Sequence, residues 1–346
     1  MTNDEQYMHR CLELAQKGLG YTAPNPLVGA VLVYNDQVIG EGYHEQFGGP
    51  HAEPNCIHSV KEEDKKNIPS ATLYVSLEPC AHFGKTPPCT DLIIEQKIPR
   101  VVIGCQDPFK QVNGAGIEKL LSANINVRMG VLENECKEVN KRFFTSHAKQ
   151  QPYIILKWAE TANGIMGHCN GKRLTISNEY TNRLVHKWRS EEMAILVGTN
   201  TALQDDPILT NRYWPGPSPI RIVLDRNLRL PKTLQIFQGQ KTIVLTDSIN
   251  ETRDTVRYIK LSEGISVPHQ LANTLFQQNI QSVLIEGGAQ LLQSFIDSEL
   301  WNEARVIINK ELFVENGVAA PTLQHAVLAG QQTLFSDNIS FYKKYS

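Results

Sequence analysis

The 346-residue sequence contains no apolar run that approaches the roughly 18 residues needed to cross a bilayer as a helix. Residues 1–5 are polar and acidic, so they lack the basic and apolar regions of a secretory leader. Basic charge is also scarce for a nucleic-acid-binding protein, because 34 basic residues stand against 36 acidic ones, for a formal net charge of −2. These absences argue against membrane and nucleic-acid partners. They favour a cytoplasmic protein that acts on a small molecule.

Low-complexity tracts and internal repeats are missing too, and the length exceeds what one hydrophobic core usually supports, so we expect two domains. Cysteine is sparse: seven residues, an odd number. Without a leader, this number predicts free thiols in a reducing compartment rather than a disulfide framework. Five of the cysteines are most simply unpaired core or surface thiols: Cys11, Cys56, Cys105, Cys136 and Cys169.

Two separate segments carry the residues of one predicted metal site. His51 and Glu53 form a His-x-Glu motif, and Cys80 and Cys89 each follow a proline. One imidazole and two thiolates supply three of the four ligands of a tetrahedral zinc site and leave one position for water. Zinc lowers the pKa of that water toward roughly 7, and a carboxylate that is not a ligand can take the proton and return it. The combination predicts a zinc-dependent base deaminase.

Each part of this motif also has a simpler interpretation. A His-x-Glu pair is common by chance, and buried cysteines usually behave as small apolar side chains. The spacing departs from the Cys-x-x-Cys of most base deaminases, because eight residues separate Cys80 from Cys89. The joint occurrence of the three ligands with the residues around them favours the zinc site.

Apolar periodicity predicts alternating helices and strands in both halves of the chain. In the first half we expect helices at 4–18, 52–60, 90–96, 116–123 and 132–142, and strands at 30–34, 38–44, 100–104 and 126–130. Residues 143–151 are polar and form the expected linker. In the second half we expect strands at 152–157, 194–198, 220–225, 242–246, 258–261 and 282–285, a helix that begins at Ser177 or Asn178, and another helix at 289–296.

Gly287 and Gly288 stand between a predicted strand and a predicted helix. Small residues there let a phosphate approach the backbone N–H groups at the helix start. A tight turn explains the pair equally well, because the Gly-x-Gly-x-x-Gly fingerprint of dinucleotide sites is missing.

Taken together, the motifs resemble the bifunctional deaminase–reductase family of riboflavin biosynthesis over nearly the whole chain. In the first half the resemblance rests on residues 25–29, 42–44, 51–53, 77–80 and 86–89, and the long gap between the two cysteines is typical of that family. In the second half it rests on residues 152–157, 194–198, 205–207, 219–223 and 286–288, which are individually weaker but occur in the family's order.

The resemblance implies an α/β protein with an N-terminal cytidine-deaminase-like α/β/α sandwich and a C-terminal dihydrofolate-reductase-like α/β domain. Residues 1–147 would form the zinc-dependent pyrimidine deaminase domain and residues 148–346 the NADPH-dependent reductase domain. The implied substrate is 2,5-diamino-6-(5-phosphoribosylamino)pyrimidin-4-one. The first domain would replace a ring amino group by oxygen, and the second would reduce the ribosyl group to ribityl. One Zn²⁺ per chain, NADPH and a homo-oligomer are implied as well.

The resemblance also assigns site residues. His51, Cys80 and Cys89 would hold zinc, with Glu53 as the catalytic proton shuttle. The residues that would contact the deaminase substrate are Asn25, His44, His82 and Lys85. Those that would contact the reductase substrate are Arg189, Leu209, Arg212 and Glu286. Those that would contact the cofactor are Lys157, Thr201, Asp205, Gly287 and Gly288.

Two segments of the second half depart from the family's pattern. Asn163 stands where many relatives have Asp, and residues 171–177, which include Lys172 and Arg173, are one residue shorter than in some relatives and lack their Trp. Both departures fall at the expected edge of the reductase pocket. Lys85, Arg189 and Arg212 suit a phosphate chemically, although a single arginine is more often a solvated surface charge.

Two other functions stay open at this point. The chain could be a single-activity deaminase whose C-terminal domain only binds substrate or drives dimerisation. A zinc-stabilised nucleic-acid-binding module is less favoured, because the charge is near neutral and a purely structural zinc site has no need of Glu53.

Overall fold

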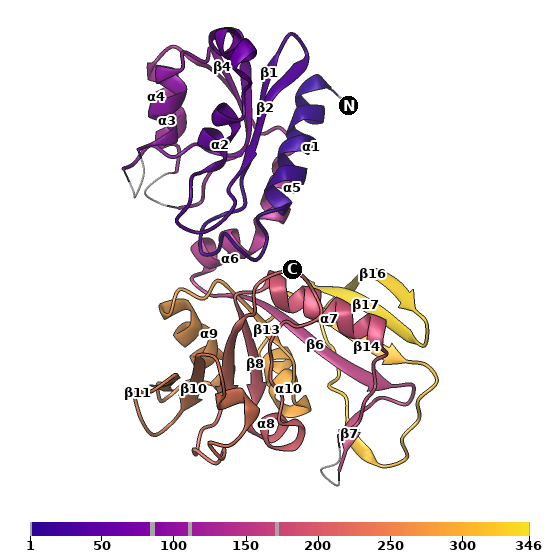
Figure 1. The fold of residues 1–346 in the computed structure, drawn as a ribbon. Coiled ribbons are helices and arrows are strands. Elements are labelled where there is room, and N and C mark those ends of the chain that lie inside the picture. Colours follow the sequence, from indigo (N-terminus) through magenta and orange to yellow (C-terminus); the bar gives the residue numbers. More distant parts are fainter. Residues whose placement is uncertain (1, 84–86, 110–112, 170–172, 346) are drawn as a thin grey trace. The chain divides into compact units, whose positions relative to one another are not determined.

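The computed structural model describes residues 2–83, 87–109, 113–169 and 173–345. The chain divides into two compact units, Met1–Lys149 and Gln150–Ser346. In Figure 1 the first unit runs from indigo to purple and the second from magenta to yellow. Among the described residues, no helix combines the length and the apolarity that a membrane span requires.

The first unit is built on a five-stranded sheet with the order β2-β1-β3-β4-β5. β1 is antiparallel to both of its neighbours, whereas β3, β4 and β5 run parallel. The strands are β1 (Gly29–Tyr34), β2 (Gln37–Tyr43), β3 (Thr72–Leu77), β4 (Arg100–Cys105) and β5 (Asn126–Met129). The helices are α1 (Asn3–Gln16), α2 (Ala52–His58), the 3-10 helix η1 (Glu62–Ser70), α3 (Cys89–Glu95), α4 (Ala115–Ser122), α5 (Glu133–Val139) and α6 (Lys141–Lys149).

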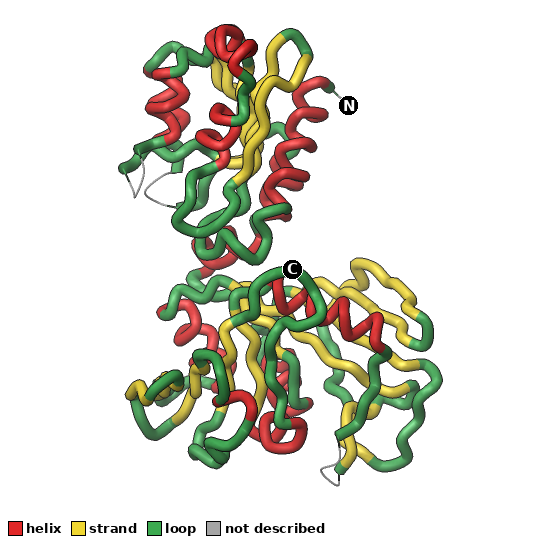
Figure 2. Tube along the Cα trace, in the orientation of Figure 1, coloured by secondary structure: helices red, strands yellow, loops and turns green. Residues whose placement is uncertain are grey.

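Alternating side chains of β1 separate two hydrophobic clusters and so create three layers. Ala30 and Leu32 face the cluster that contains α2, α3 and α4. Val31 and Val33 face the cluster that contains α1 and α5. Because successive strand residues point to opposite faces, this sequence of four buried residues covers the sheet on both sides. Figure 2 shows the strands as one layer between the helices, and the result is the expected α/β/α sandwich.

Asp4 joins the first helix to the sheet through buried charge. Its carboxylate accepts hydrogen bonds from Arg100 at 2.7 Å and from the Tyr74 hydroxyl at 2.7 Å, and it pairs with Arg128. Burial alone would raise the pKa of Asp4, but the hydrogen bonds from Arg100 and Tyr74 outweigh it and lower the pKa. The ionised carboxylate therefore stabilises the folded first unit.

We expect Asp4→Asn to destabilise the first unit by roughly 1–3 kcal/mol at pH 7, because Arg100 and Arg128 keep their charges but lose the buried carboxylate that pairs with both. The folded-state pKa lies below the unfolded value of about 3.9, so the contribution is complete above that value and disappears as the pH falls through the folded pKa. Urea unfolding at pH 7 and near pH 3 should show a smaller difference between wild type and variant in acid than at pH 7. An equal difference at both pH values would contradict this role.

The second unit contains a ten-stranded sheet with the order β11-β12-β10-β9-β8-β13-β6-β14-β17-β16. Its core is parallel, and β11, β17 and β16 run antiparallel to their neighbours. The strands are β6 (Tyr153–Thr161), β8 (Ala194–Gly198), β9 (Ile220–Leu224), β10 (Thr242–Thr246), β11 (Glu251–Arg253), β12 (Val256–Lys260), β13 (Ser282–Ile285), β14 (Glu303–Asn309), β16 (Ala326–Leu334) and β17 (Asp337–Lys344). β7 (Ile165–His168) and β15 (Gly317–Ala319) form a separate two-stranded sheet.

Helices cover both faces of the ten-stranded sheet. α9 (Val267–Gln277) and α10 (Ala289–Asp297) pack on one face, and α7 (Glu179–Glu191) packs on the other. The remaining helices are α8 (Thr199–Asp205) and the short η2 (Gln235–Phe237). Asn178 caps α7, because its side chain accepts hydrogen bonds from the backbone N–H groups of Tyr180 and Thr181.

One expected connection is wrong. Residues 143–151 were predicted as a linker, but α6 extends to Lys149 and buries Phe143 and Ser146. The polar residues of this segment form the exposed side of an amphipathic helix, which a count of polar residues does not distinguish from a linker.

Candidate functional sites: a metal centre and a charged pocket

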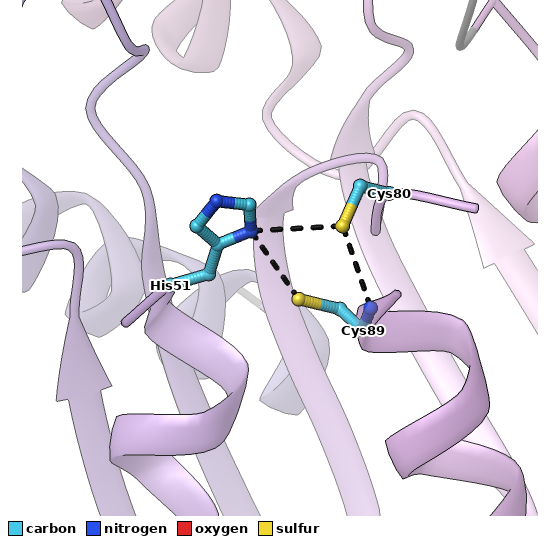
Figure 3. Close-up of side chains that lie close together, drawn as sticks. All are labelled: His51, Cys80 and Cys89. Atoms are coloured by element: carbon cyan, nitrogen blue, oxygen red, sulfur yellow. Dashed lines mark hydrogen bonds between the residues drawn. The ribbon is translucent and has the colours of Figure 1, made fainter. Parts of the chain in front are cut away.

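Three side chains from three different segments converge in the first unit. His51 is the N-cap residue of α2, Cys89 is the first residue of α3, and Cys80 lies in the segment after β3. Figure 3 shows the imidazole and both sulfurs pointing toward one another. The His51 Nδ1 atom lies 3.6 Å from the Cys80 sulfur and 3.4 Å from the Cys89 sulfur.

These separations fit a tetrahedral zinc ion. Zn–S bonds of about 2.3 Å and Zn–N bonds of about 2.0–2.1 Å at a tetrahedral angle place nitrogen and sulfur roughly 3.6 Å apart. All three ligand atoms lie within 4.8 Å of one another. Soft thiolates with one imidazole are also the donor set that zinc prefers. The residues therefore fit the metal, which supplies the Lewis acidity that makes water a nucleophile near neutral pH.

The two thiols differ in their electrostatics. Hydrogen bonding with Cys89 and with the His51 ring lowers the pKa of Cys80 to about 4, against the opposing effect of burial. The backbone N–H of Cys89 also donates to the Cys80 sulfur at 3.4 Å. The pKa of Cys89 is raised by the Cys80 sulfur and by burial. A thiolate is thus already favoured at Cys80, and thiolate is the form that binds metals.

Glu53 lies two residues beyond His51 on α2, and only 3% of it is exposed. Burial, together with the Cys80 thiolate, raises the pKa of Glu53 to about 7. A carboxyl group with such a pKa can accept a proton and release it near neutral pH, which is what general acid–base catalysis requires.

Asn25 and His44 form a hydrogen-bonded pair beside the metal ligands. His44 Nδ1 lies 2.8 Å from the carbonyl oxygen of Pro50. Because a carbonyl oxygen only accepts, Nδ1 carries the proton, and Nε2 can accept from the Asn25 amide at 3.1 Å. Burial lowers the pKa of His44, which keeps the ring neutral, and the ring meets His51 edge-on with centroids 5.4 Å apart.

The other two predicted deaminase contacts are placed differently. His82 is exposed, two residues after the metal ligand Cys80. Lys85 lies outside the described residues. Asp107, which the sequence does not single out, is buried two residues after the end of β4, and burial raises its pKa to about 6. In the sequence it precedes a proline and resembles a common turn, so only its burial separates it from other acidic residues.

Glu78 holds this part of the first unit together through backbone groups. Its carboxylate accepts hydrogen bonds from the N–H groups of Asp107, Gly114, Gly116 and Ile117, at distances from 2.9 to 3.4 Å. A Cβ atom at Gly116 would come within 2.1 Å of the Pro79 carbonyl oxygen, so only glycine fits there. Glu78 thus ties the start of the Cys80 segment to the segment that carries Asp107.

We expect Cys80→Ser to reduce zinc affinity by at least about 100-fold, because it removes a direct thiolate ligand. Elemental analysis of purified protein measures the metal content. Cys169→Ser is the matched control, because Cys169 is exposed and lies outside the cluster. A full zinc complement after replacement of both Cys80 and Cys89 would contradict the assignment.

The second unit contains a buried cluster of opposite charges. Ile285 pairs with Leu156 and with Leu196, so Glu286 leaves β13 beside the Lys157 position of β6. Arg189 of α7 binds Glu286 with two parallel hydrogen bonds of 2.8 Å, and the Lys157 ammonium lies 3.8 Å from the same carboxylate. Burial alone would raise the pKa of Glu286, but the charges of Arg189 and Lys157 lower it to about 2. Burial lowers the pKa of Lys157.

A cavity of about 280 Å³ opens beside this cluster. Among its lining residues are eight predicted site residues: Lys157, Arg189, Thr201, Asp205, Leu209, Glu286, Gly287 and Gly288. Arg173, from the segment that departs from the family's pattern, lines it as well. A Cβ atom at Gly288 would come within 3.0 Å of the Thr201 hydroxyl, so the glycine keeps space open at the start of α10. Backbone N–H groups at a helix start suit a phosphate, and the wall thus fits a phosphorylated nicotinamide cofactor, which supplies hydride.

Two residues of the second unit that the sequence analysis named, Arg212 and Asn163, are not among the lining residues of this cavity. Arg212 is exposed and follows the cavity-lining Leu209 by three residues. Asn163 bonds with Thr161 at 2.8 Å and with the Val314 carbonyl at 2.9 Å, so it stabilises the turn between β6 and β7. Lys172 lies outside the described residues.

The fold and the two sites define a two-domain enzyme. A His-Cys-Cys zinc centre with a buried carboxylate in an α/β/α unit is a deaminase domain of the cytidine deaminase type, and the second unit is a dihydrofolate-reductase-like reductase domain. Residues 1–105 match the family model described as the cytidine and deoxycytidylate deaminase zinc-binding region. Residues 152–313 match the model described as the RibD C-terminal domain.

Full-length relatives give the family. The riboflavin biosynthesis protein RibD of Aquifex aeolicus is 37% identical, with 99% of each chain covered. That of Escherichia coli is 36% identical over 89% of this chain and 88% of its own. The crystal structure of a diaminohydroxyphosphoribosylaminopyrimidine deaminase/5-amino-6-(5-phosphoribosylamino)uracil reductase from Thermotoga maritima is 35% identical, has a TM-score of 0.90 and covers 99% of each chain. The chain belongs to the RibD family of bifunctional riboflavin-biosynthesis enzymes, which combine a zinc-dependent deaminase with an NADPH-dependent reductase.

Proposed function

We propose that the chain catalyses two consecutive reactions on one pyrimidine phosphate. The first unit hydrolyses an amino group of 2,5-diamino-6-(5-phosphoribosylamino)pyrimidin-4-one and releases ammonia. The second unit then transfers hydride from NADPH to the ribosyl carbon attached to nitrogen, which converts ribosyl into ribityl. The observation that carries this proposal is the presence, in one chain, of a zinc-type His-Cys-Cys centre and a separate charged pocket with a glycine-lined wall.

In the deaminase half, we assign proton transfer to Glu53. Its carboxylate takes the proton of the attacking water and delivers it to the departing amino group, so the same group acts first as base and then as acid. His51, Cys80 and Cys89 are the metal ligands. Asn25 and His44 bind the substrate as a fixed pair, and His82, Lys85 and Asp107 contact its ring or its phosphoribosyl group. The burial of Asp107 next to the Glu78 network supports its inclusion.

In the reductase half, we assign the cavity beside Glu286 to cofactor and substrate together. Thr201, Asp205, Gly287 and Gly288 bind the cofactor, and Lys157 lies next to the nicotinamide. Arg189, Leu209, Arg212 and Glu286 form the substrate side. Because the Arg189 guanidinium already donates to Glu286 and to the Thr210 carbonyl, we assign the phosphate to Arg212, which is an exposed residue.

We propose domain limits close to 1–147 and 148–346, with the boundary moved to the end of α6, where the compact units divide.

We also propose a homo-oligomer. β16 forms an outer edge of the ten-stranded sheet, and about half of Val327 and of Leu328 is exposed there, at 49% and 48%. Sedimentation at several protein concentrations tests the oligomeric state.

Seven free thiols are consistent with a reducing compartment such as the cytoplasm.

Incubation of the purified protein with the diaminopyrimidine phosphate, with and without NADPH, tests the two-step reaction. Without NADPH, mass spectrometry should find the product in which oxygen replaces an amino group. With NADPH, a further product should carry two more hydrogen atoms, and cofactor absorbance should fall in proportion. Deamination without any reduction of the supplied intermediate would leave the single-activity deaminase as the function.

A further inference from the structure

Helix α7 contacts the segment Leu209–Arg212 at two backbone groups. Arg189 donates from Nη1 to the carbonyl oxygen of Thr210 at 3.2 Å. One turn earlier, His186 Nδ1 accepts the backbone N–H of Arg212 at 2.8 Å. Residues three apart on a helix lie on the same face, so the two side chains reach the same segment. The helix thereby holds the backbone on both sides of Asn211.

The hydrogen bond from the Arg212 backbone N–H determines the tautomer of His186. A backbone N–H can only donate, so Nδ1 must be unprotonated and the neutral ring carries its proton on Nε2. The side chain is 4% exposed, and burial with the nearby cations Arg189 and Arg212 lowers the pKa of His186 to about 4. The imidazole is therefore a permanent acceptor near neutral pH. Its ring also packs edge-on against Tyr213, with centroids 4.7 Å apart.

The segment Leu209–Arg212 has an unfavourable backbone conformation at its first residue. Leu209 is buried and has φ of +57°, in the left-handed region that side-chain-bearing residues rarely occupy. Beyond it, the Thr210 hydroxyl accepts from Arg212 Nη1 at 3.0 Å. The Arg212 guanidinium is thus directed by its own backbone anchor and by Thr210, while Leu209 lines the cavity.

We propose that His186 is a positioning residue of the reductase half: by accepting the Arg212 N–H, it fixes the segment Leu209–Arg212 and aims the Arg212 guanidinium at the phosphate of the substrate. The proposal rests on the substrate role assigned to Arg212 above. Binding the phosphate with a pre-ordered arginine avoids the entropic cost of ordering the segment on binding. The effect should therefore appear in substrate affinity rather than in hydride transfer.

Two variants separate the hydrogen bond from the packing of the ring. His186→Phe keeps a ring against Tyr213 but removes the acceptor and leaves the Arg212 N–H without it. His186→Asn places its Oδ1 near the position of Nδ1 and keeps the acceptor while losing the ring. We expect His186→Phe to raise KM for the deaminated intermediate about tenfold with little change in kcat. His186→Asn should restore most of the affinity.

Amide hydrogen exchange on the full chain provides a readout that does not depend on activity. In His186→Phe, exchange at residues 209–213 should rise, while exchange in the first unit and the rate of deamination stay at wild-type values. Arg212→Ala tests the underlying assignment, because it should raise KM for the intermediate by itself. If exchange does not rise in His186→Phe, or if it rises equally in His186→Asn, the positioning role is overturned. If exchange responds as expected but Arg212→Ala binds the intermediate normally, the substrate role of Arg212 fails instead.

Discussion

Glu53→Gln should abolish deamination while zinc stays bound. Glutamine has nearly the shape of glutamate, but its amide cannot take the proton of the attacking water or return it to the departing amino group. General acid–base catalysis is typically worth about 10²–10⁴-fold, so the deamination rate should fall by that amount. The three ligand atoms are untouched, and the zinc content should remain at one ion per chain.

The same variant tests whether the two activities are separate. The charged pocket lies wholly within the second unit, so Glu53→Gln should still reduce the deaminated intermediate when that compound is supplied directly. Deamination is measured by ammonia release, reduction by NADPH absorbance and the metal by elemental analysis. Near-normal ammonia release would mean that another residue moves the proton. Loss of zinc would show that the variant disturbs the site instead of removing one step.

Arg189→Ala should have the largest effect on the second unit. The Arg189 and Glu286 side chains are only 13% and 7% exposed. After the substitution, the buried Glu286 carboxylate keeps only the Lys157 ammonium, 3.8 Å away, as a partner from this cluster. Removing one partner of a buried ion pair typically costs about 3–5 kcal/mol. We expect the second unit to lose stability on that scale and reduction at limiting substrate to fall about 10²-fold or more. Ammonia release by the first unit should be unchanged.

Two further variants separate the loss of fold from the loss of function. Arg189→Lys keeps the charge but not the two parallel hydrogen bonds, so its stability should lie between those of wild type and Arg189→Ala. The triple variant Lys157→Met, Arg189→Met and Glu286→Leu removes all three charges of the cluster, and such replacements of buried ion pairs or triads are often neutral for stability. It should therefore melt near the wild-type temperature and still fail to reduce the intermediate. Normal reduction by this triple variant would exclude the charged cluster from the reaction.

The clustering of His51, Cys80 and Cys89 could be predicted from the sequence because its information is local. His51 is the N-cap of α2, two residues before Glu53, and Cys89 is the first residue of α3. The motif residues therefore coincide with helix starts that the sequence also predicts. The alternating strands and helices of both units were predictable for the same reason, since burial follows the period of each element. The helix after Cys89 could likewise be predicted from the apolar residues of its first turn alone.

Contacts between distant segments were not predictable. Arg189 and Glu286 are 97 positions apart, and nothing near either residue shows that the carboxylate occupies the guanidinium. The sequence does not single out Asp107 or His186, for which we propose roles, because an acidic residue before a proline and a histidine on a buried helix face are both common without a function. The C-terminal strands β14, β16 and β17 also had no expected counterpart, because their pairing depends on register across the sheet and not on a local motif.

Glu78 has a consequence for which substitutions this chain can tolerate. A carboxylate that binds four main-chain N–H groups makes no demand on the side chains of the residues it holds. Substitution of the Asp107 side chain should therefore leave its backbone hydrogen bond to Glu78 in place and preserve the path of this segment. The exception is Gly116, where any side chain would collide with the Pro79 carbonyl.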